Sequence, residues 1–268
     1  MRLLIIFLFI SSSSFGGTVD TVLIQSESMH NTISCVVIRP GTYKSKRNHF
    51  PVVYLLHGYS GNYANWITKA PELKLYADQY NIMIVCPDGN SDSWYFDSPL
   101  DSNYRYETHV CREVVPYIDS HYRTLADASH RAITGLSMGG HGALYLALRH
   151  ADLFGAAGSM SGGLELKDSK NRFDISKRIG DTLQYAQNWH DMTVVNLVDK
   201  YPGTHLRIIF DCGIRDFFLN GNRKLHEKLI QLNIPHDYTE RPGEHNWDYW
   251  LNSLPYHLLF FQRYFGRK

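Results

Sequence analysis

The segment Gly135–Gly139 (GLSMG) constrains the fold of this chain more than any other. It matches the pattern G-x-S-x-G, it follows the apolar run RAIT, and it leads into the helical pattern GGHGALYLAL. A serine at a tight strand-to-helix turn holds its hydroxyl clear of a sheet, and the flanking glycines permit the strained turn. The segment therefore predicts a strand, a sharp turn that presents Ser137, and a helix that begins directly after it.

The rest of the chain alternates short strand-like runs with helical patterns. The strand-like runs are rich in Val and Ile, and they lie at Val19–Gln25, Thr32–Ile38, Val52–His57, Ile82–Pro87, Arg131–Ser137, Ala156–Met160, Leu206–Asp211 and Asp237–Glu240. Helical patterns lie at Glu107–His121, Gly140–His150, Arg223–Leu232 and Trp247–Phe265. This alternation predicts an α/β fold with a mostly parallel central sheet and helices on both faces. The first two runs have no helix between them, so we expect an antiparallel hairpin at the N-terminal edge, with Met29–Asn31 as its turn.

One domain is expected over residues 17–268, because the chain shows neither an internal repeat nor a long low-complexity linker. Between Met160 and Leu206 the alternation stops, and the stretch holds charged segments and a weak helical pattern around Trp189. A long excursion from an α/β domain is often a lid or a binding loop. Residues 163–205 are therefore interpreted either as a lid or as a surface insertion without a role.

Residues 1–16 have the order of an export signal. Arg2 supplies a positive charge, Leu3–Ile10 form an unbroken apolar run, and small residues follow in SSSSFGG. The apolar run is shorter than the roughly 20 residues that span a bilayer, and no cysteine follows directly to carry a lipid. We expect a secreted or periplasmic protein without a membrane anchor; a buried N-terminal strand is the alternative interpretation.

The charge balance and the cysteine count exclude several classes of protein. The chain carries 27 Lys and Arg against 26 Asp and Glu, a net charge of +1, so it has no general attraction to nucleic acid or to an anionic membrane. Four cysteines in 268 residues are too few for a disulfide scaffold. Buried free thiols account for all four, and one disulfide is the alternative in an exported protein.

A serine hydroxyl is a poor nucleophile near neutral pH and needs a neighbouring base, which an acid then orients. In this turn architecture the chain order is serine, acid, histidine. His245 lies in RPGEHNWDYW, between the last predicted strand and the last predicted helix, and is the expected base. Asp216 lies in the loop after Leu206–Asp211 and is the expected acid.

Two backbone N–H groups are expected to stabilise the oxyanion that forms on attack. One belongs to Met138, which follows the nucleophile, and the other to Tyr59, in the loop HGYSGN after the third predicted strand. His57 is expected to hold that loop by hydrogen bonds. Aromatic rings near the mouth of the expected active site can stack on a sugar ring or a phenolic acid. The expected substrate-binding residues are Tyr63, Trp189 and Phe217.

Six segments in this order resemble the esterase D family of α/β-hydrolases: HGYSGNYANW, CPDGN, YETHVCREVVPYIDSHYRT, GLSMGGHGAL, DCGIRDFFLNGN and GEHNWDYW. The similarity runs from about Val19 to Phe265 and is strongest to the tributyrin esterase and feruloyl or acetylxylan esterase branch. The resemblance implies the α/β-hydrolase fold and ester hydrolysis through an acyl-enzyme, with neither a metal nor an organic cofactor. It also implies that Ser137, Asp216 and His245 form the triad and that Tyr59 and Met138 are the oxyanion donors.

The resulting hypothesis is a serine carboxylesterase for short-chain acyl or aryl esters, with acetyl or feruloyl groups on plant polysaccharide as candidate substrates. Its partner is then a small-molecule or carbohydrate-linked ester. Three alternatives stay open: an acyltransferase on the same scaffold, a thioesterase similar to S-formylglutathione hydrolase, and a non-catalytic binding module. The acyl and alcohol specificity and the oligomeric state do not follow from the sequence.

Overall fold

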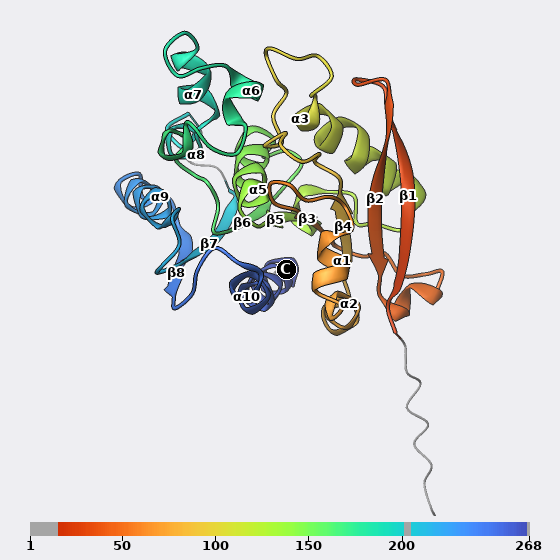
Figure 1. The fold of residues 1–268 in the computed structure, drawn as a ribbon. Helices are drawn as coiled ribbons and strands as arrows, with labels where there is room; N and C mark the ends of the chain where they lie inside the picture. Colours follow the sequence, from red (N-terminus) through yellow and green to blue (C-terminus); the bar gives the residue numbers. More distant parts are fainter. Residues whose placement is uncertain (1–15, 201–204, 267–268) are drawn as a thin grey trace, which may run out of the picture.

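The structure, a computed structural model, describes residues 16–200 and 205–266. The predicted export signal lies outside the described residues except for Gly16. An eight-stranded sheet crosses the molecule in the order β1-β2-β4-β3-β5-β6-β7-β8 (Figure 1). The strands are β1 (Thr18–Ser26), β2 (Asn31–Arg39), β3 (Val52–Leu56), β4 (Met83–Pro87), β5 (Arg131–Gly135), β6 (Ala156–Met160), β7 (Arg207–Gly213) and β8 (His236–Arg241).

The pairing of the strands confirms the predicted fold class. Strands β3 to β8 pair in parallel, and β1 and β2 add an antiparallel edge. The hairpin turn spans residues 27–30, slightly ahead of the predicted Met29–Asn31, and His30 takes the left-handed conformation there with φ 50°. Because β3, β5, β7 and β8 are parallel, the loops that follow them meet at one edge of the sheet.

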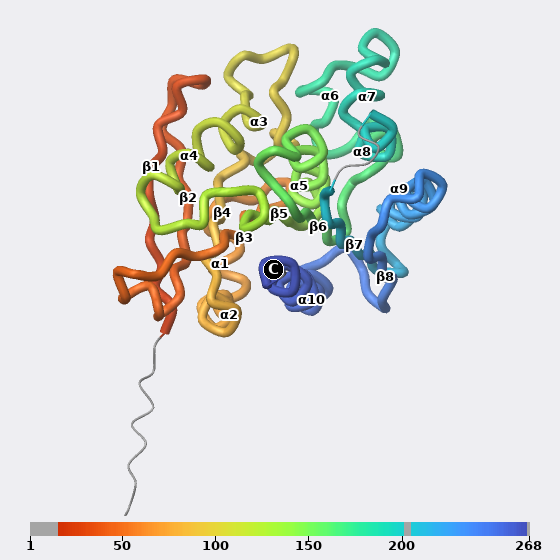
Figure 2. The backbone as a smooth tube through the Cα atoms, turned by 180° about the vertical axis from the view of Figure 1, so that it is seen from behind, coloured from red at the N-terminus to blue at the C-terminus, as the bar shows by residue number. Residues whose placement is uncertain are grey.

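Helices cover both faces of the sheet, as Figures 1 and 2 show from opposite sides. One face carries α1 (Asn65–Lys69), α2 (Leu73–Tyr80) and α10 (Trp247–Phe265). The other face carries α4 (Val115–His121), α5 (Met138–Arg149), α8 (Val194–Leu197) and α9 (Leu219–Gln231). The short α3 (Tyr106–Thr108) reaches α5 through hydrogen bonds of Glu107 with Tyr145 and Arg149. A π-helical stretch, η2 (His109–Val114), joins α3 to α4, so the predicted helix Glu107–His121 forms with a locally widened turn.

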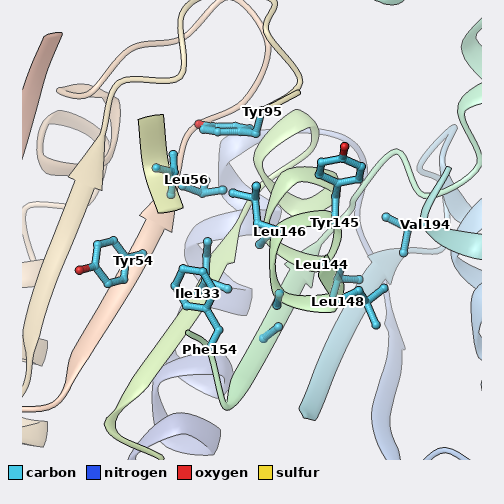
Figure 3. Close-up of a cluster of buried hydrophobic side chains, with 14 of the residues drawn as sticks. Tyr54, Leu56, Tyr95, Ile133, Leu144, Tyr145, Leu146, Leu148, Phe154 and Val194 are labelled. Carbon is cyan, nitrogen blue, oxygen red and sulfur yellow. The ribbon is translucent and has the colours of Figure 1, made fainter. Parts of the chain in front are cut away.

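The central strand β3 shows why the core has two layers. Val52, Tyr54 and Leu56 pack with the helices of the α5 face, whereas Val53 and Leu55 pack with those of the α10 face. Successive strand side chains point to opposite faces, and a strand covered on both faces is apolar at every position. Figure 3 shows the α5 layer, where Tyr54, Leu56 and Ile133 meet the buried side chains of α5.

The stretch without predicted strands folds into short helices, with no strand between residues 161 and 200. It holds η4 (Leu166–Ser169), α6 (Ile175–Ile179), α7 (Ala186–Met192) and α8. The sequence prediction also lacked α1, α2 and the short 3-10 turns η1 (Gly41–Lys44) and η3 (Ala128–His130). Elements of one or two turns are too short to show an apolar period, so packing rather than pattern determines them.

All four cysteines are buried and unpaired, which agrees with the free-thiol interpretation. Burial raises the pKa of each thiol well above its ordinary value, so these side chains behave as small apolar residues. Over residues 16–200 and 205–266, none of the helices combines the length and the apolar character that crossing a membrane requires.

Candidate active site

Ser137 occupies a strained turn between β5 and α5. Its backbone dihedrals, φ 55° and ψ −116°, lie outside the regions that non-glycine residues ordinarily adopt. The turn can pack closely against the end of β3 because residue 139 is a glycine. A Cβ at this position would lie only 2.5 Å from the His57 carbonyl oxygen. Strain of this kind persists only where the surrounding structure enforces it, and it is typical of functional sites. The turn sets the Ser137 side chain at the carboxyl edge of the sheet.

Ser137, His245 and Asp216 form one hydrogen-bonded row. The Ser137 Oγ lies 2.8 Å from His245 Nε2, and His245 Nδ1 lies 2.8 Å from Asp216 Oδ2. The buried Asp216 accepts a further bond from the Phe218 N–H through Oδ1, which fixes the plane of the carboxylate. Because a carboxylate only accepts, Nδ1–H donates to Asp216 and leaves the Nε2 lone pair for the serine hydroxyl. This tautomer is the one that a general base requires.

Three loops at the same sheet edge supply these side chains. Ser137 follows β5, Asp216 follows β7, and His245 lies between β8 and α10, where the sequence predicted each of them. The Asn246 side chain accepts the Tyr249 N–H and caps the start of α10, so the histidine sits one residue before a fixed helix terminus. The order of the sheet thus brings together residues 79 and 29 positions apart in the sequence (137 to 216, 216 to 245).

Tyr59 lines the same cavity as Ser137, and Met138 directly follows Ser137 in the chain. Met138 is the first residue of α5, so its N–H has no acceptor within the helix. The Gly58 carbonyl accepts His57 Nδ1–H at 2.9 Å and the Gly61 N–H at 3.1 Å. Since the C=O and N–H of a peptide point in opposite directions, these two bonds fix the direction of the Tyr59 N–H. Within the described part of the chain, that N–H makes no hydrogen bond.

The buried His57 holds this loop, as predicted. Its Nε2 accepts the Gly89 N–H at 2.8 Å while its Nδ1–H donates to the Gly58 carbonyl. The imidazole is therefore neutral, in a single tautomer, and connects the loop after β3 with the loop after β4. His57 shapes the site from below without touching Ser137.

A cavity of about 500 Å³ opens over the serine. Ser137, His245 and Leu136 line its floor, and Tyr59, Phe173, Trp247 and Trp250 give it aromatic walls. A slightly larger groove of about 560 Å³ lies between β8 and α10, but neither Ser137 nor His245 borders it. The chemistry of the lining, rather than volume, therefore identifies the candidate site.

Of the three predicted substrate-binding residues, only Phe217 lies against the triad. Its ring is 45% exposed, and the ring centroid is 4.3 Å from that of His245. Tyr63 is half-buried against the α10-face core and does not line the cavity. Trp189 is fully buried, and its indole N–H donates to the Gly180 carbonyl at 2.8 Å. Because this bond satisfies the polar end of the ring, the whole side chain serves as core rather than as a substrate platform.

Several residues that line the cavity were not predicted. Trp247 and Trp250 lie three positions apart at the start of α10, so their spacing after His245 places both on the helix face toward the cavity. The spacing of the two tryptophans in the motif GEHNWDYW could therefore have identified them from the sequence. Phe173 comes from the charged stretch KDSKNRFD, which carries no periodic pattern, and only tertiary packing brings it to the mouth.

The residues that the structure describes hold no group of three His, Cys, Asp or Glu side chains arranged to bind a metal ion. The side chains gathered around Ser137 are instead a base, a carboxylate and aromatic rings. This arrangement can remove a proton from a hydroxyl and stabilise an anion beside a helix N-terminus, which are the two requirements of acyl transfer.

Comparisons with known proteins agree with this geometry. The Esterase family model matches residues 26–261. An acetyl esterase of Caldicellulosiruptor saccharolyticus is 30% identical over 74% of this chain and 78% of its own length. Esterase Rv1288 of Mycobacterium tuberculosis is 28% identical over 78% of this chain, which spans only about half (51%) of that protein.

A solved structure of a ferulic acid esterase superposes with a TM-score of 0.82 at 27% identity. The superposition covers 93% of this chain and 98% of that one. The extent of this superposition confirms the predicted architecture. The family match confirms the predicted enzyme class, the carboxylic-ester hydrolases, as the class of the family. The chain belongs to the esterase family of α/β-hydrolases, as its resemblance to the esterase D family predicted.

Proposed function

We propose that this protein is a serine carboxylesterase that hydrolyses short-chain acyl or aryl esters through an acyl-enzyme. The observation that carries the proposal is the row Asp216–His245–Ser137, with both links at 2.8 Å, at the floor of a cavity. Ser137 is the nucleophile, His245 the general acid and base, and Asp216 the residue that orients the imidazole.

In the first half of the reaction, Ser137 Oγ attacks the ester carbonyl carbon while His245 Nε2 takes the hydroxyl proton. The carbonyl oxygen becomes an oxyanion that accepts the N–H groups of Tyr59 and Met138. When the tetrahedral intermediate collapses, the bond to the alcohol oxygen breaks, and His245 returns the proton to the leaving alcohol. The acyl group then remains on Ser137.

In the second half, water replaces the alcohol. His245 takes a proton from the water, whose oxygen attacks the acyl carbon, and the same two N–H groups stabilise the second oxyanion. Collapse breaks the bond to Ser137 Oγ, which regains its proton from His245, and the carboxylic acid leaves. Throughout, Asp216 stabilises the imidazolium without taking its proton.

Acetyl or feruloyl groups on plant polysaccharide are the substrates that we propose within this class. An acetyl esterase and a ferulic acid esterase are among the similar proteins, and the walls of the cavity are aromatic. Aromatic rings stack on sugar and phenolic rings. The apolar run Leu3–Ile10 supports the further proposal that the enzyme acts outside the cytoplasm, where such polymers are found.

A hydrolysis panel tests the proposed function. It contains p-nitrophenyl acetate, butyrate and octanoate, methyl ferulate, acetylated xylan and S-formylglutathione. The wild type is expected to cleave acetate and butyrate, and Ser137→Ala to lose on the order of 10⁶-fold in kcat. Ser129→Ala is the matched control, because Ser129 is exposed in η3, just before β5 and away from the carboxyl edge of the sheet. Equal activity of Ser137→Ala and Ser129→Ala would refute the proposal.

A further inference from the structure

The segment between β6 and β7 supplies one wall of the catalytic cavity through a single side chain. Phe173 lines the cavity together with Ser137, His245 and Tyr59. It lies between η4 and α6, in the stretch interpreted from sequence as either a lid or an insertion without a role. Its position means that this segment borders the space a substrate would occupy.

Contacts on several sides hold Phe173 in place. The Trp94 indole N–H donates to its carbonyl at 3.0 Å. Its ring is nearly parallel to that of Phe217 at 5.9 Å, and the Arg172 guanidinium lies 4.6 Å from the centre of each ring. Tyr59 meets the Phe173 ring edge-on at 5.5 Å. Phe173 is therefore a fixed wall of the cavity rather than a loose surface residue.

A hydrogen bond across the mouth joins this wall to the loop after β3. The Tyr59 hydroxyl donates to Asp174 Oδ2 at 2.7 Å, although the Tyr59 side chain is 36% exposed. The Asp174 carboxylate also pairs with Lys177 Nζ at 3.0 Å. This hydrogen bond raises the pKa of Tyr59 and, with the Lys177 contact, lowers that of Asp174, so the phenol donates to an ionised carboxylate at neutral pH.

The backbone at the wall is strained. Phe173 and Asp174 adopt left-handed conformations in succession, with φ of 59° and 53°, and neither residue is glycine. A bulky side chain at positive φ costs free energy that the contacts around it must offset. The contacts of Phe173 with Trp94 and Phe217 and of Asp174 with Tyr59 are those that hold the turn.

We propose that Phe173 is a specificity-determining residue of this esterase, and that the Tyr59–Asp174 hydrogen bond holds it in the wall above Ser137. The proposal rests on the proposed esterase function. In this account the wall limits the size of the acyl or alcohol group that lies beside Phe173, so within a series of esters that differ in this group the smaller one is preferred. A substrate that needs the space of the Phe173 ring is excluded by steric overlap rather than by charge.

The test measures selectivity rather than activity alone. One pair of substrates varies the acyl group (p-nitrophenyl acetate and octanoate), and a second pair varies the alcohol (phenyl acetate and 2-naphthyl acetate). The kcat/KM ratio of the larger to the smaller substrate is measured in each pair. Phe173→Ala is expected to raise this ratio about tenfold or more in at least one pair, the scale on which a pocket discriminates by size.

Variants of the hydrogen bond test the second half of the proposal. Tyr59→Phe and Asp174→Ala are each expected to raise the same kcat/KM ratio several-fold. The double variant should raise it no further, because each single variant already removes the same Tyr59–Asp174 hydrogen bond. Asp174→Asn keeps an oxygen that accepts the phenol proton and should stay near wild type. Tyr256→Phe is the matched control, because it removes an exposed hydroxyl on α10 that does not border this cavity.

The outcomes separate this inference from the function on which it rests. Folded Phe173→Ala with ratios within about twofold of wild type in both pairs would overturn the inference and leave the esterase proposal standing. An additive effect of the two single variants, or a shift in Tyr256→Phe, would overturn the role of the hydrogen bond. A wild type inactive on every ester would overturn the proposed function and this inference with it.

Discussion

At the scale of single residues, the site depends on which nitrogen atom of each histidine donates a hydrogen bond. Asp216 accepts from His245 Nδ1–H, and this one bond leaves Nε2 free to take the proton of Ser137. His57 plays a comparable part in the loop after β3. Its Nδ1–H donates to the Gly58 carbonyl and so directs the N–H of Tyr59. In both cases the tautomer of a histidine determines the direction of a catalytically useful group.

Removing the acid and removing the base should have unequal effects. Asp216→Asn keeps the shape of the side chain but favours the wrong imidazole tautomer, and we expect kcat to fall on the order of 10⁴-fold. His245→Ala removes the base itself, and we expect a fall on the order of 10⁶-fold. Steady-state kinetics with p-nitrophenyl acetate measures both. A larger loss in Asp216→Asn than in His245→Ala would contradict these roles.

His57 should influence catalysis without touching substrate. His57→Ala frees the Gly58–Tyr59 peptide, so we expect kcat to fall between about tenfold and a hundredfold, up to the effect of losing one oxyanion donor, with little change in KM. His57→Asn keeps one donor and one acceptor and should recover part of this loss. Thermal unfolding of both variants serves as the control. An unchanged kcat in folded His57→Ala would show that the bond to Gly58 does not position the donor.

At the scale of elements, α10 is held to β7 by one buried carboxylate. Asp211 accepts hydrogen bonds from Tyr249, Ser253 and His257, all on α10, and it pairs with Arg241 at 3.2 Å. His257 in turn bonds Thr134 of β5 at 2.9 Å. Since His245 lies in the loop just before the Asn246 cap of α10, this network fixes the helix to which the loop with the proposed base is joined.

Asp211 should link stability to acidic pH. Burial alone raises its pKa, but the hydrogen bonds from His257 and Ser253 and the charge of Arg241 outweigh burial and lower it below its ordinary value. A carboxyl with a depressed folded-state pKa stabilises the fold above its unfolded pKa, and this stability is lost as the pH falls below about 4. We therefore expect the free energy of unfolding, measured by urea denaturation, to decrease over this range.

The variant Asp211→Ala isolates this contribution. It leaves three buried partners and the half-buried Arg241 without their acceptor, and we expect a loss of about 3 kcal/mol or more at pH 7. The part of the acid dependence that belongs to Asp211 should disappear with it. A change of less than about 1 kcal/mol would mean that the network does not hold α10.

The long periodic elements could be predicted from the sequence, and the short ones could not. Each predicted strand appears, and α10 has the predicted bounds Trp247–Phe265, because burial on one or both faces imposes a regular pattern on its residues. The segment around α6 and α7 buries scattered apolar residues, such as Ile175, Ile179 and Trp189, whose spacing forms no regular period in the sequence. The sequence therefore predicts Trp189 only as an aromatic ring near the site, whereas the structure buries it in the core.

At the scale of the entire fold, the parallel sheet explains why the positions of the proposed catalytic side chains could be predicted but the cavity could not. Ser137, Asp216 and His245 follow strands β5, β7 and β8, and parallel strands bring their carboxyl ends to one edge. Motif position is then enough to place them. The cavity depends on how the segment with Phe173 folds over that edge, which no local motif specifies.

The proposed chemistry depends on Ser137 as a nucleophile that His245 activates. The most direct measurement is labelling of the purified protein with a fluorophosphonate, followed by mass mapping of its peptides. The account predicts one labelled peptide, which contains Ser137, with rapid labelling in wild type and in Ser129→Ala and almost none in His245→Ala. A label on a different serine, or ester hydrolysis by a protein whose Ser137 stays unlabelled, would contradict it.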